Sequence, residues 1–262
     1  MIQKEIEQMI QKTFAIISEN SNKNKGVCIY MTTIKAPFFE IGPKSYLYGD
    51  DVVELAKAAD AASEKYGVDI IFTTPVIEIE RVKAATKHIH VFAPHMDPLR
   101  PGRGLTEILP ESLKAAGVEG VMLNHCERPL SLGVLKETIA RADEVGLATI
   151  VCADSLAEAQ AVAAFTPNII VAEPSELVGT GVSVGPEYVE TATKAVKDVN
   201  ADILVLTAAG ISKGEDVYNT FKAGADATGT SSGIAKLKTR EERNAMVEEM
   251  ISAARKAWDE TH

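Results

Sequence analysis

The sequence predicts a closed (β/α)8 barrel that is preceded by an N-terminal helical extension. Short apolar runs alternate with amphipathic stretches eight times over about 225 residues, which matches the pattern and length of such a barrel. The apolar runs are nearly continuous, as expected for strands of a parallel sheet that helices cover. A chain of 262 residues with 46% hydrophobic and 24% charged residues suits one large α/β domain.

From residue 38 onward the expected elements follow at a nearly constant interval. Apolar runs predict strands at 38–42, 69–73, 89–93, 120–125, 148–153, 168–173, 203–207 and 225–229. Helical spacing of apolar residues predicts helices at 51–66, 77–87, 109–116, 130–145, 156–165, 186–199, 214–223 and 240–259. An open doubly wound sheet is the alternative, and it usually carries a GxGxxG turn after its first strand. The turn at 42–46 reads Gly-Pro-Lys-Ser-Tyr, which lacks that pattern.

Residues 1–36 stand apart from the barrel, which is expected to occupy 37–262. Apolar residues from Ile2 to Ile17 recur at helical spacing and are followed by a polar run at 19–24, so an amphipathic helix is predicted. Packing of this helix against the barrel is favoured, and contact with another subunit is the alternative. Nothing in this extension suggests chemistry.

Charge and cysteine content limit the possible partners. A net charge of −10 argues against nucleic acid and against an anionic membrane, so an anionic substrate must be bound by local donors. The three cysteines, Cys28, Cys126 and Cys152, are odd in number, widely spaced and lack CxxC pairing, which favours a reducing compartment. No apolar run approaches the ~18 residues of a membrane span. A cytoplasmic location is therefore expected.

Ionisable residues stand at the predicted strand ends, where the chemistry of such a barrel takes place. They are Lys44 after the first strand, His125 and Glu127 at the fourth, and Glu173 at the sixth. Each has an ordinary alternative, as a solvated lysine, a structural histidine or a surface carboxylate. Their joint placement at one barrel mouth favours a catalytic role for Lys44, His125 and Glu173. Glu127 is expected to support them as an ion-pair partner.

Two loops rich in small residues follow the last two strands. Residues 207–212 and 229–233 place glycine, serine and threonine where helices begin, which is a frequent phosphate site in this fold. The segment Gly179-Thr180-Gly181 is positioned to close over the same anion. His88, His90 and His95 are interpreted as structural rather than as a zinc site, because a closed site needs about four suitably spaced ligands. No metal and no cofactor is expected.

The segments at 44, 117–128, 172–181, 209–217 and 231–233 together resemble the triosephosphate isomerase family, especially its shorter archaeal members. The resemblance covers residues 38 to about 258 in the family's order and implies the TIM-barrel fold, a phosphorylated sugar substrate and a homo-oligomer, either dimer or tetramer. It implies that Glu173 is the base, His125 the neutral electrophile and Lys44 the cation that stabilises the enediolate. It further implies that residues 174–181 form a closing lid. Substrate or phosphate contacts are expected at Gly42, Val178, Gly179, Gly210, Ser231, Ser232 and Gly233.

Several positions depart from that family's pattern. Gly42 replaces an asparagine, Pro94 a glutamine and Cys126 a serine. Alternation along the first strand also points Glu40 into the barrel, where a buried carboxylate needs a partner. Glu40 and Lys44 are interpreted either as a structural ion pair or as a change that retunes the site. The favoured hypothesis is interconversion of dihydroxyacetone phosphate and D-glyceraldehyde 3-phosphate. The alternatives are an isomerase of a four-carbon sugar phosphate, with Gly42 and Pro94 making room, and a catalytically silent phosphate-binding paralogue.

Overall fold

A computed structural model describes residues 34–177, 180, 184–208 and 210–262. Its eight parallel strands form a closed barrel in sequence order, and pairing of β8 with β1 completes the ring. The strands are β1 (Phe38–Ile41), β2 (Asp69–Thr73), β3 (His90–Ala93), β4 (Gly120–Leu123), β5 (Ala148–Ala153), β6 (Ile169–Ala172), β7 (Leu204–Leu206) and β8 (Ala227–Thr230). The predicted (β/α)8 barrel is confirmed. The predicted helix within residues 1–36 lies outside the described residues.

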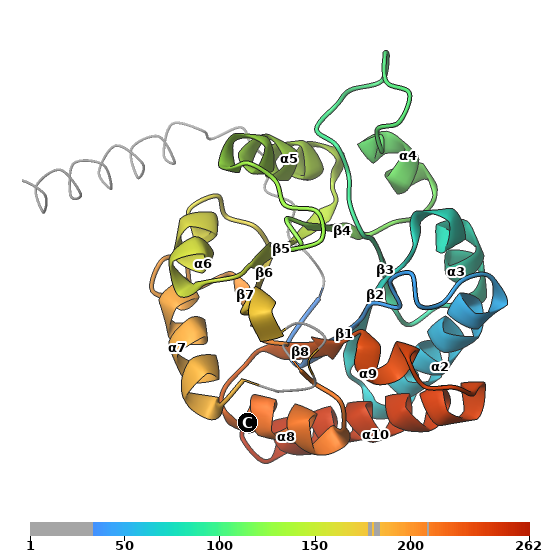
Figure 1. Ribbon diagram of the computed structural model, residues 1–262, viewed down its shortest axis with the longest axis vertical. Coiled ribbons are helices and arrows are strands. Elements are labelled where there is room, and N and C mark those ends of the chain that lie inside the picture. The colour runs from blue at the N-terminus through green and yellow to red at the C-terminus, as the bar shows by residue number, and fades with distance from the viewer. Residues whose placement is uncertain (1–33, 178–179, 181–183, 209) are drawn as a thin grey trace, which may run out of the picture.

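Helices surround the barrel on its outside, as Figure 1 shows in a view along it. They are α2 (Asp50–Tyr66), α3 (Ile79–Ala85), α4 (Pro110–Ala115), α5 (Leu132–Val145), α6 (Leu156–Ala163), α7 (Pro186–Lys197), α8 (Gly214–Lys222), α9 (Ser232–Ala235) and α10 (Arg240–Asp259). Short 3-10 turns, η1 (Val76–Glu78) and η2 (Ser175–Leu177), follow β2 and β6. No helix in the described part of the chain is both long and apolar enough to cross a membrane.

Local sequence signals account for the helix ends. Ser131 and Ser155 accept hydrogen bonds from the first turns of α5 and α6, and Thr239 forms a capping box with Glu242 at the start of α10. At the other end, α2 stops at Gly67, whose φ of 62° lies in the left-handed region that favours glycine. The N-terminal caps mark where the preceding loops end, and Gly67 marks where the loop from α2 to β2 begins.

The core has two layers because side chains alternate along every strand. Phe38, Ile71, Phe92, Ile150 and Val171 belong to a cluster that fills the inside of the barrel. The neighbouring positions, such as Phe39 and Phe72, pack outward against the helices in the larger cluster. This packed interior leaves the carboxyl ends of the strands as the place for a site.

Several predicted boundaries differ from the structure. Strand β4 was expected to reach residue 125 but ends at Leu123, because the next residue, Asn124, has a φ of 58°. Strand β6 ends at Ala172, one residue before Glu173. The helix expected at 77–87 begins as the 3-10 turn η1 and continues as α3. The short helix α9 was not predicted, because four residues are too few to show a period.

Candidate active site

The loop after β4 holds His125 in a defined protonation state. The backbone N–H of Glu127 donates to His125 Nδ1 at 3.1 Å, so Nδ1 accepts and the neutral ring carries its proton on Nε2. Burial lowers the pKa of His125, and the nearby Lys44 ammonium lowers it further, against the opposing effect of Glu127. The imidazole is therefore a neutral hydrogen-bond donor at neutral pH.

Asn124 fixes the geometry of this loop, and the sequence analysis did not identify it. Its Nδ2 donates to Cys152 O and to Glu158 Oε1, both at 2.9 Å, and its Oδ1 accepts from Leu130 N at 2.9 Å. Asparagine tolerates the left-handed conformation better than most residues, which permits the turn that leads into His125. The sequence did offer one signal for Asn124: an asparagine stands at the end of a predicted strand, directly before a candidate histidine.

Lys44 lies at the same mouth, in the loop after β1. Its φ of 47° is unusual for a residue other than glycine, and Asn124 shares this feature, so the backbone is strained at two points of one site. Lys44 Nζ contacts Glu127 Oε1 at 3.1 Å. Glu127 thus contacts both Lys44, through its carboxylate, and His125, through its backbone amide. Because the pair is solvent-exposed, its effect on stability is small and its role is to hold the ammonium group.

Glu173 directly follows β6, and its backbone N–H donates to Ala153 O at 3.0 Å. Burial raises the pKa of Glu173, and the Lys44 ammonium opposes that rise. A cavity of about 130 Å³ opens between the ends of β4, β5 and β6, and its lining includes His125, Cys126, Cys152 and Glu173. The carboxyl group and the imidazole therefore face a common space that a small molecule can enter.

The loops after β7 and β8 pack against each other. Thr230 Oγ1 donates to Ile211 O at 2.7 Å, and a Cβ on Gly233 would lie 2.6 Å from that same oxygen, so only glycine fits there. Gly210, with a φ of 74°, begins the turn on the β7 side, and Ser232 and Gly233 begin α9. Within the described residues, the buried hydroxyls of Ser231 and Thr207 have no hydrogen-bond partner. An anion bound at these loops would supply an acceptor for the hydroxyl of Ser231.

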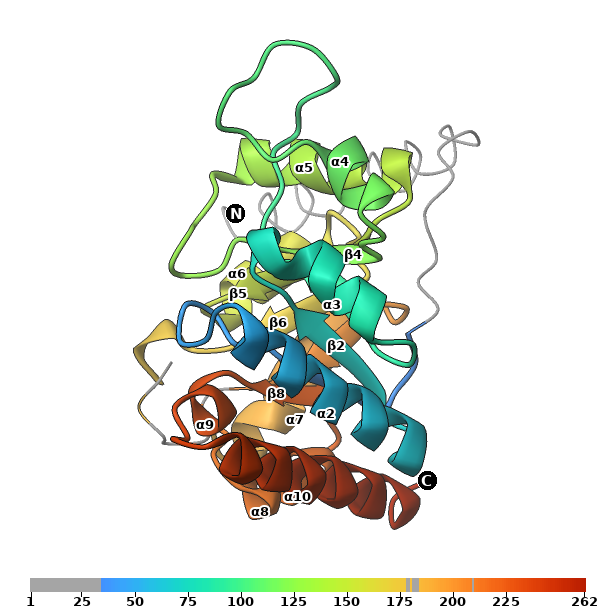
Figure 2. The same cartoon turned by 90° about the vertical axis from the view of Figure 1, so that its right-hand side faces the viewer.

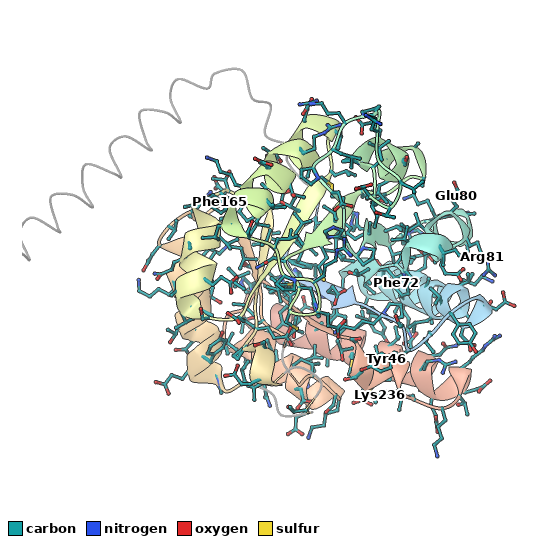
Figure 3. All side chains as sticks on the ribbon, turned by 45° about the horizontal axis from the view of Figure 1, so that its top comes forward. Tyr46, Phe72, Glu80, Arg81, Phe165 and Lys236 are labelled. Carbon is teal, nitrogen blue, oxygen red and sulfur yellow. The ribbon has the colours of Figure 1, made fainter. Side chains whose placement is uncertain are left out.

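Two of the expected substrate contacts, Val178 and Gly179, lie outside the described residues, as does Gly181 at the end of the expected lid. Gly42 is described: it follows β1, and its backbone N–H donates to Thr230 O at 3.2 Å. Cys126 Sγ lies 3.7 Å from His125 Nδ1, as a weak partner in place of a hydroxyl. In the loop after β1, the centroid of the Tyr46 ring lies 5.4 Å from Lys236 Nζ, and Figure 3 shows the two side chains next to each other.

The three histidines near β3 each lie beside a separate carboxylate. His88 Nε2 is 3.5 Å from Glu64, His90 Nδ1 is 2.7 Å from Glu119, and His95 Nε2 is 3.1 Å from Asp97. Among the residues that the structure describes, no group of three or more His, Cys, Asp or Glu side chains is arranged to hold a metal ion. Each of these histidines therefore has a carboxylate neighbour of its own.

A closed (β/α)8 barrel that places a partly buried carboxyl group, a neutral imidazole and an ammonium group at one mouth has the groups that an aldose–ketose isomerase requires. A family model described as Triosephosphate isomerase matches residues 43–254. Among curated proteins, the triosephosphate isomerase of Sulfurisphaera tokodaii is 38% identical over 230 residues, covering 86% of this chain and 99% of that protein. That of Methanocaldococcus jannaschii is 39% identical over 197 residues, covering 74% and 90%. The chain belongs to the triosephosphate isomerase family.

Proposed function

We propose that the protein interconverts dihydroxyacetone phosphate and D-glyceraldehyde 3-phosphate through an enediolate. The observation that carries the proposal is the protonation pattern of the site: the carboxyl group of Glu173 is partly buried near Lys44, and His125 has its proton on Nε2. A carbon acid next to a carbonyl needs such a base at the C–H bond and such a donor at the developing oxyanion. The relatives named triosephosphate isomerase in two archaea support the same reaction.

Each residue then has a defined task. Glu173 takes a proton from one carbon and returns it to the neighbouring carbon, while His125 Nε2–H polarises the carbonyl oxygen and moves protons between the two oxygens. Lys44 stabilises the negative charge of the enediolate and of the phosphate. We propose that the phosphate binds at Gly210, Ser231, Ser232 and Gly233, where the hydroxyl of Ser231, which has no partner among the residues described, is available to donate. Val178 and Gly179 are proposed to cover it.

The decisive test is a coupled assay of the purified protein with dihydroxyacetone phosphate, produced in a host whose own isomerase gene has been deleted. We expect turnover of the three-carbon substrate and at least tenfold lower kcat/KM for a four-carbon ketose phosphate. The reason is that the space beside Gly42 is occupied: a Cβ placed there would lie 3.1 Å from Glu40 Oε1. Equal activity on both substrates would favour the four-carbon alternative, and binding without turnover would favour the silent paralogue.

Acidification is expected to reduce kcat/KM with a midpoint above pH 4.5, the ordinary pKa of a glutamate. Burial raises the pKa of Glu173, so the base becomes protonated, and inactive, at a higher pH than a solvated carboxylate does. Burial lowers the pKa of His125, so the imidazole becomes protonated at a lower pH than a solvated histidine does. The measurement is kcat/KM against pH, with the substrate's own phosphate ionisation titrated separately and divided out. Full activity retained to pH 4.5 in a folded sample would contradict the assignment of Glu173.

Self-association through the loops after β1, β2 and β3 is also proposed. The loop between β3 and α4 projects from the barrel in Figure 2, and Leu105 within it is 98% exposed. Tyr48 and Ile77, in the two preceding loops, are 83% and 88% exposed. Large apolar side chains exposed on three consecutive loops at the same end of the barrel offer apolar surface that a protein interface would bury. A second copy of the chain is the occupant that the family membership favours.

Replacing Leu105 with Asp is therefore expected to weaken the dimer by about tenfold or more in Kd, because a charge would be buried in the contact. Sedimentation equilibrium at several protein concentrations measures the change. Val199→Asp is the matched control, since Val199 is an exposed aliphatic residue between α7 and β7, at the other end of the barrel. A wild-type protein that is monomeric at micromolar concentration, or equal effects of the two substitutions, would contradict this interface.

We further propose that the protein acts in the cytoplasm. Cys126 and Cys152, the two cysteines within the described residues, are both free thiols. An odd number of cysteines without paired spacing is typical of proteins kept in a reducing compartment.

A further inference from the structure

Glu40 is a carboxyl group inside the barrel, directly below the site. It occupies an inward position of β1, two residues after Phe38, which belongs to the interior cluster. Thr73 Oγ1, from the end of β2, donates to Glu40 Oε1 at 2.5 Å. Lys44 contacts Glu127 instead. The partner of Glu40 is thus a neutral hydroxyl, and the Glu40–Lys44 ion pair considered from the sequence is not formed.

Two glycines make room for this carboxyl group. A Cβ on Gly42 would lie 3.1 Å from Glu40 Oε1, so the carboxyl group occupies the space where a side chain at position 42 would begin. A Cβ on Gly229, on the neighbouring strand β8, would lie 2.9 Å from Glu40 Cβ and 3.2 Å from Oε2. The carboxyl group of Glu40 therefore fills the space that a side chain at position 42 would occupy, on the barrel-interior side of the site.

One oxygen of Glu40 is available to a ligand. Glu40 is 9% exposed, whereas Phe38, Phe39 and Ile41 of the same strand are 0–1% exposed. Since the interior below is filled, this residual exposure comes from the mouth of the barrel. Oε1 accepts from Thr73, and within the described residues Oε2 has no hydrogen-bond partner.

Charged and titratable groups face Glu40 from three sides. Lys44 approaches from the loop after β1, Glu173 from the end of β6 and the partly buried thiol of Cys152 from β5. Burial raises the pKa of Glu40 to about 7, and Glu173 adds to the rise, while the Thr73 hydrogen bond and Lys44 lower it. Glu40 is accordingly mostly a hydrogen-bond donor below about pH 7 and mostly an anion above it.

We propose that Glu40 is a substrate-binding group of this enzyme, which donates a hydrogen bond from Oε2 to an oxygen of the phosphorylated substrate next to Lys44. The proposal rests on the proposed isomerase function and adds a contact to its site. A carboxylate in that place would repel an anionic substrate and has no proton to donate, so only the protonated form binds well. Substrate binding therefore retains or takes up a proton at Glu40.

The first consequence concerns KM. Wild-type KM for dihydroxyacetone phosphate is expected to rise about tenfold between pH 6.5 and 8, as Glu40 ionises in the free enzyme, while kcat changes less. Glu40→Gln preserves the shape and carries an amide N–H₂ donor at every pH, so its KM is expected to stay flat. Glu80→Gln is the matched control, because Glu80 is exposed on the outer helix α3, as Figure 3 shows. Identical KM profiles for wild type and Glu40→Gln would overturn the proposal.

A binding measurement tests Glu40 without any turnover. Glycerol 3-phosphate keeps three carbons and the phosphate but has no carbonyl to react. Titration calorimetry at pH 7.5 in two buffers of different ionisation enthalpy gives the number of protons taken up on binding. Protons taken up by the ligand itself cancel when wild type is compared with Glu40→Gln. Wild type is expected to take up a fraction of a proton more than Glu40→Gln. Equal uptake overturns the Glu40 proposal, whereas absent turnover in the assay above overturns the proposed function alone.

Thr73→Val keeps the carboxyl group and removes its hydrogen bond, so it guards against a Glu40→Gln variant that fails to fold. The Thr73 hydrogen bond lowers the pKa of Glu40, and its loss is expected to move the rise in KM to higher pH. A purely structural role for Glu40 predicts no such shift. An unchanged midpoint in folded Thr73→Val would therefore count against the proposal.

Discussion

Glu173→Gln is expected to lower kcat for dihydroxyacetone phosphate by about 10²–10⁴-fold, the usual contribution of a positioned base, while KM changes little. The amide has nearly the same shape as the carboxylate but cannot accept a proton from carbon. Binding should survive, because the proposed phosphate contacts lie on the loops after β7 and β8 and Lys44 is untouched. The measurements are kcat and KM, together with the rate of deuterium uptake into the substrate from D₂O.

The matched control is Glu187→Gln, which removes an exposed carboxylate from the first turn of α7. Its kcat is expected to equal that of the wild type. Deuterium uptake distinguishes loss of the base from slowed product release. Only loss of the base stops the exchange of hydrogen at carbon. If Glu173→Gln retained nearly full turnover and exchange in a preparation free of host isomerase, the assigned role of Glu173 would be wrong.

The barrel was predictable from the sequence because its signal is repeated eight times, so an error at one strand did not change the fold. Alternation along β1 also predicted that Glu40 points inward, and the structure agrees. The partner of Glu40 was not predictable in the same way. Thr73 lies 33 residues further along, and a period of two indicates which face a side chain occupies but not which side chain lies across from it.

The supporting contacts of the site were missed for a related reason. Asn124 acts through a positive φ and three hydrogen bonds, and neither leaves a periodic pattern in a sequence. The approach of Gly233 to Ile211 joins two loops that sequence analysis treats separately. Strand ends could thus be located, and candidate residues placed on them, whereas the contacts that orient His125 needed coordinates.

The second large effect concerns folding: Gly120→Ala is expected to destabilise the protein by about 3 kcal/mol, the upper part of the usual range for overpacking. Gly120 lies opposite Phe92 on the neighbouring strand, inside the barrel. An added Cβ would lie 2.3 Å from two atoms of the Phe92 ring and 2.7 Å from Ala148 O. The ring has no room to move because the interior cluster surrounds it.

Urea unfolding followed by circular dichroism measures this change, and two further variants make the test specific. Gly133→Ala, in the first turn of α5, meets no atom within 4 Å and is expected to stabilise by up to about 1 kcal/mol, because alanine favours the helix. Phe92→Leu removes the ring that causes most of the clash, so Gly120→Ala should cost at least about 1 kcal/mol less in that background. The rescue should be incomplete, since the backbone oxygen of Ala148 remains. Additive effects of Gly120→Ala and Phe92→Leu on the free energy of unfolding would mean that the Phe92 ring does not lie over Gly120. The side chains of β3 and β4 would then pack inside the barrel in a different way.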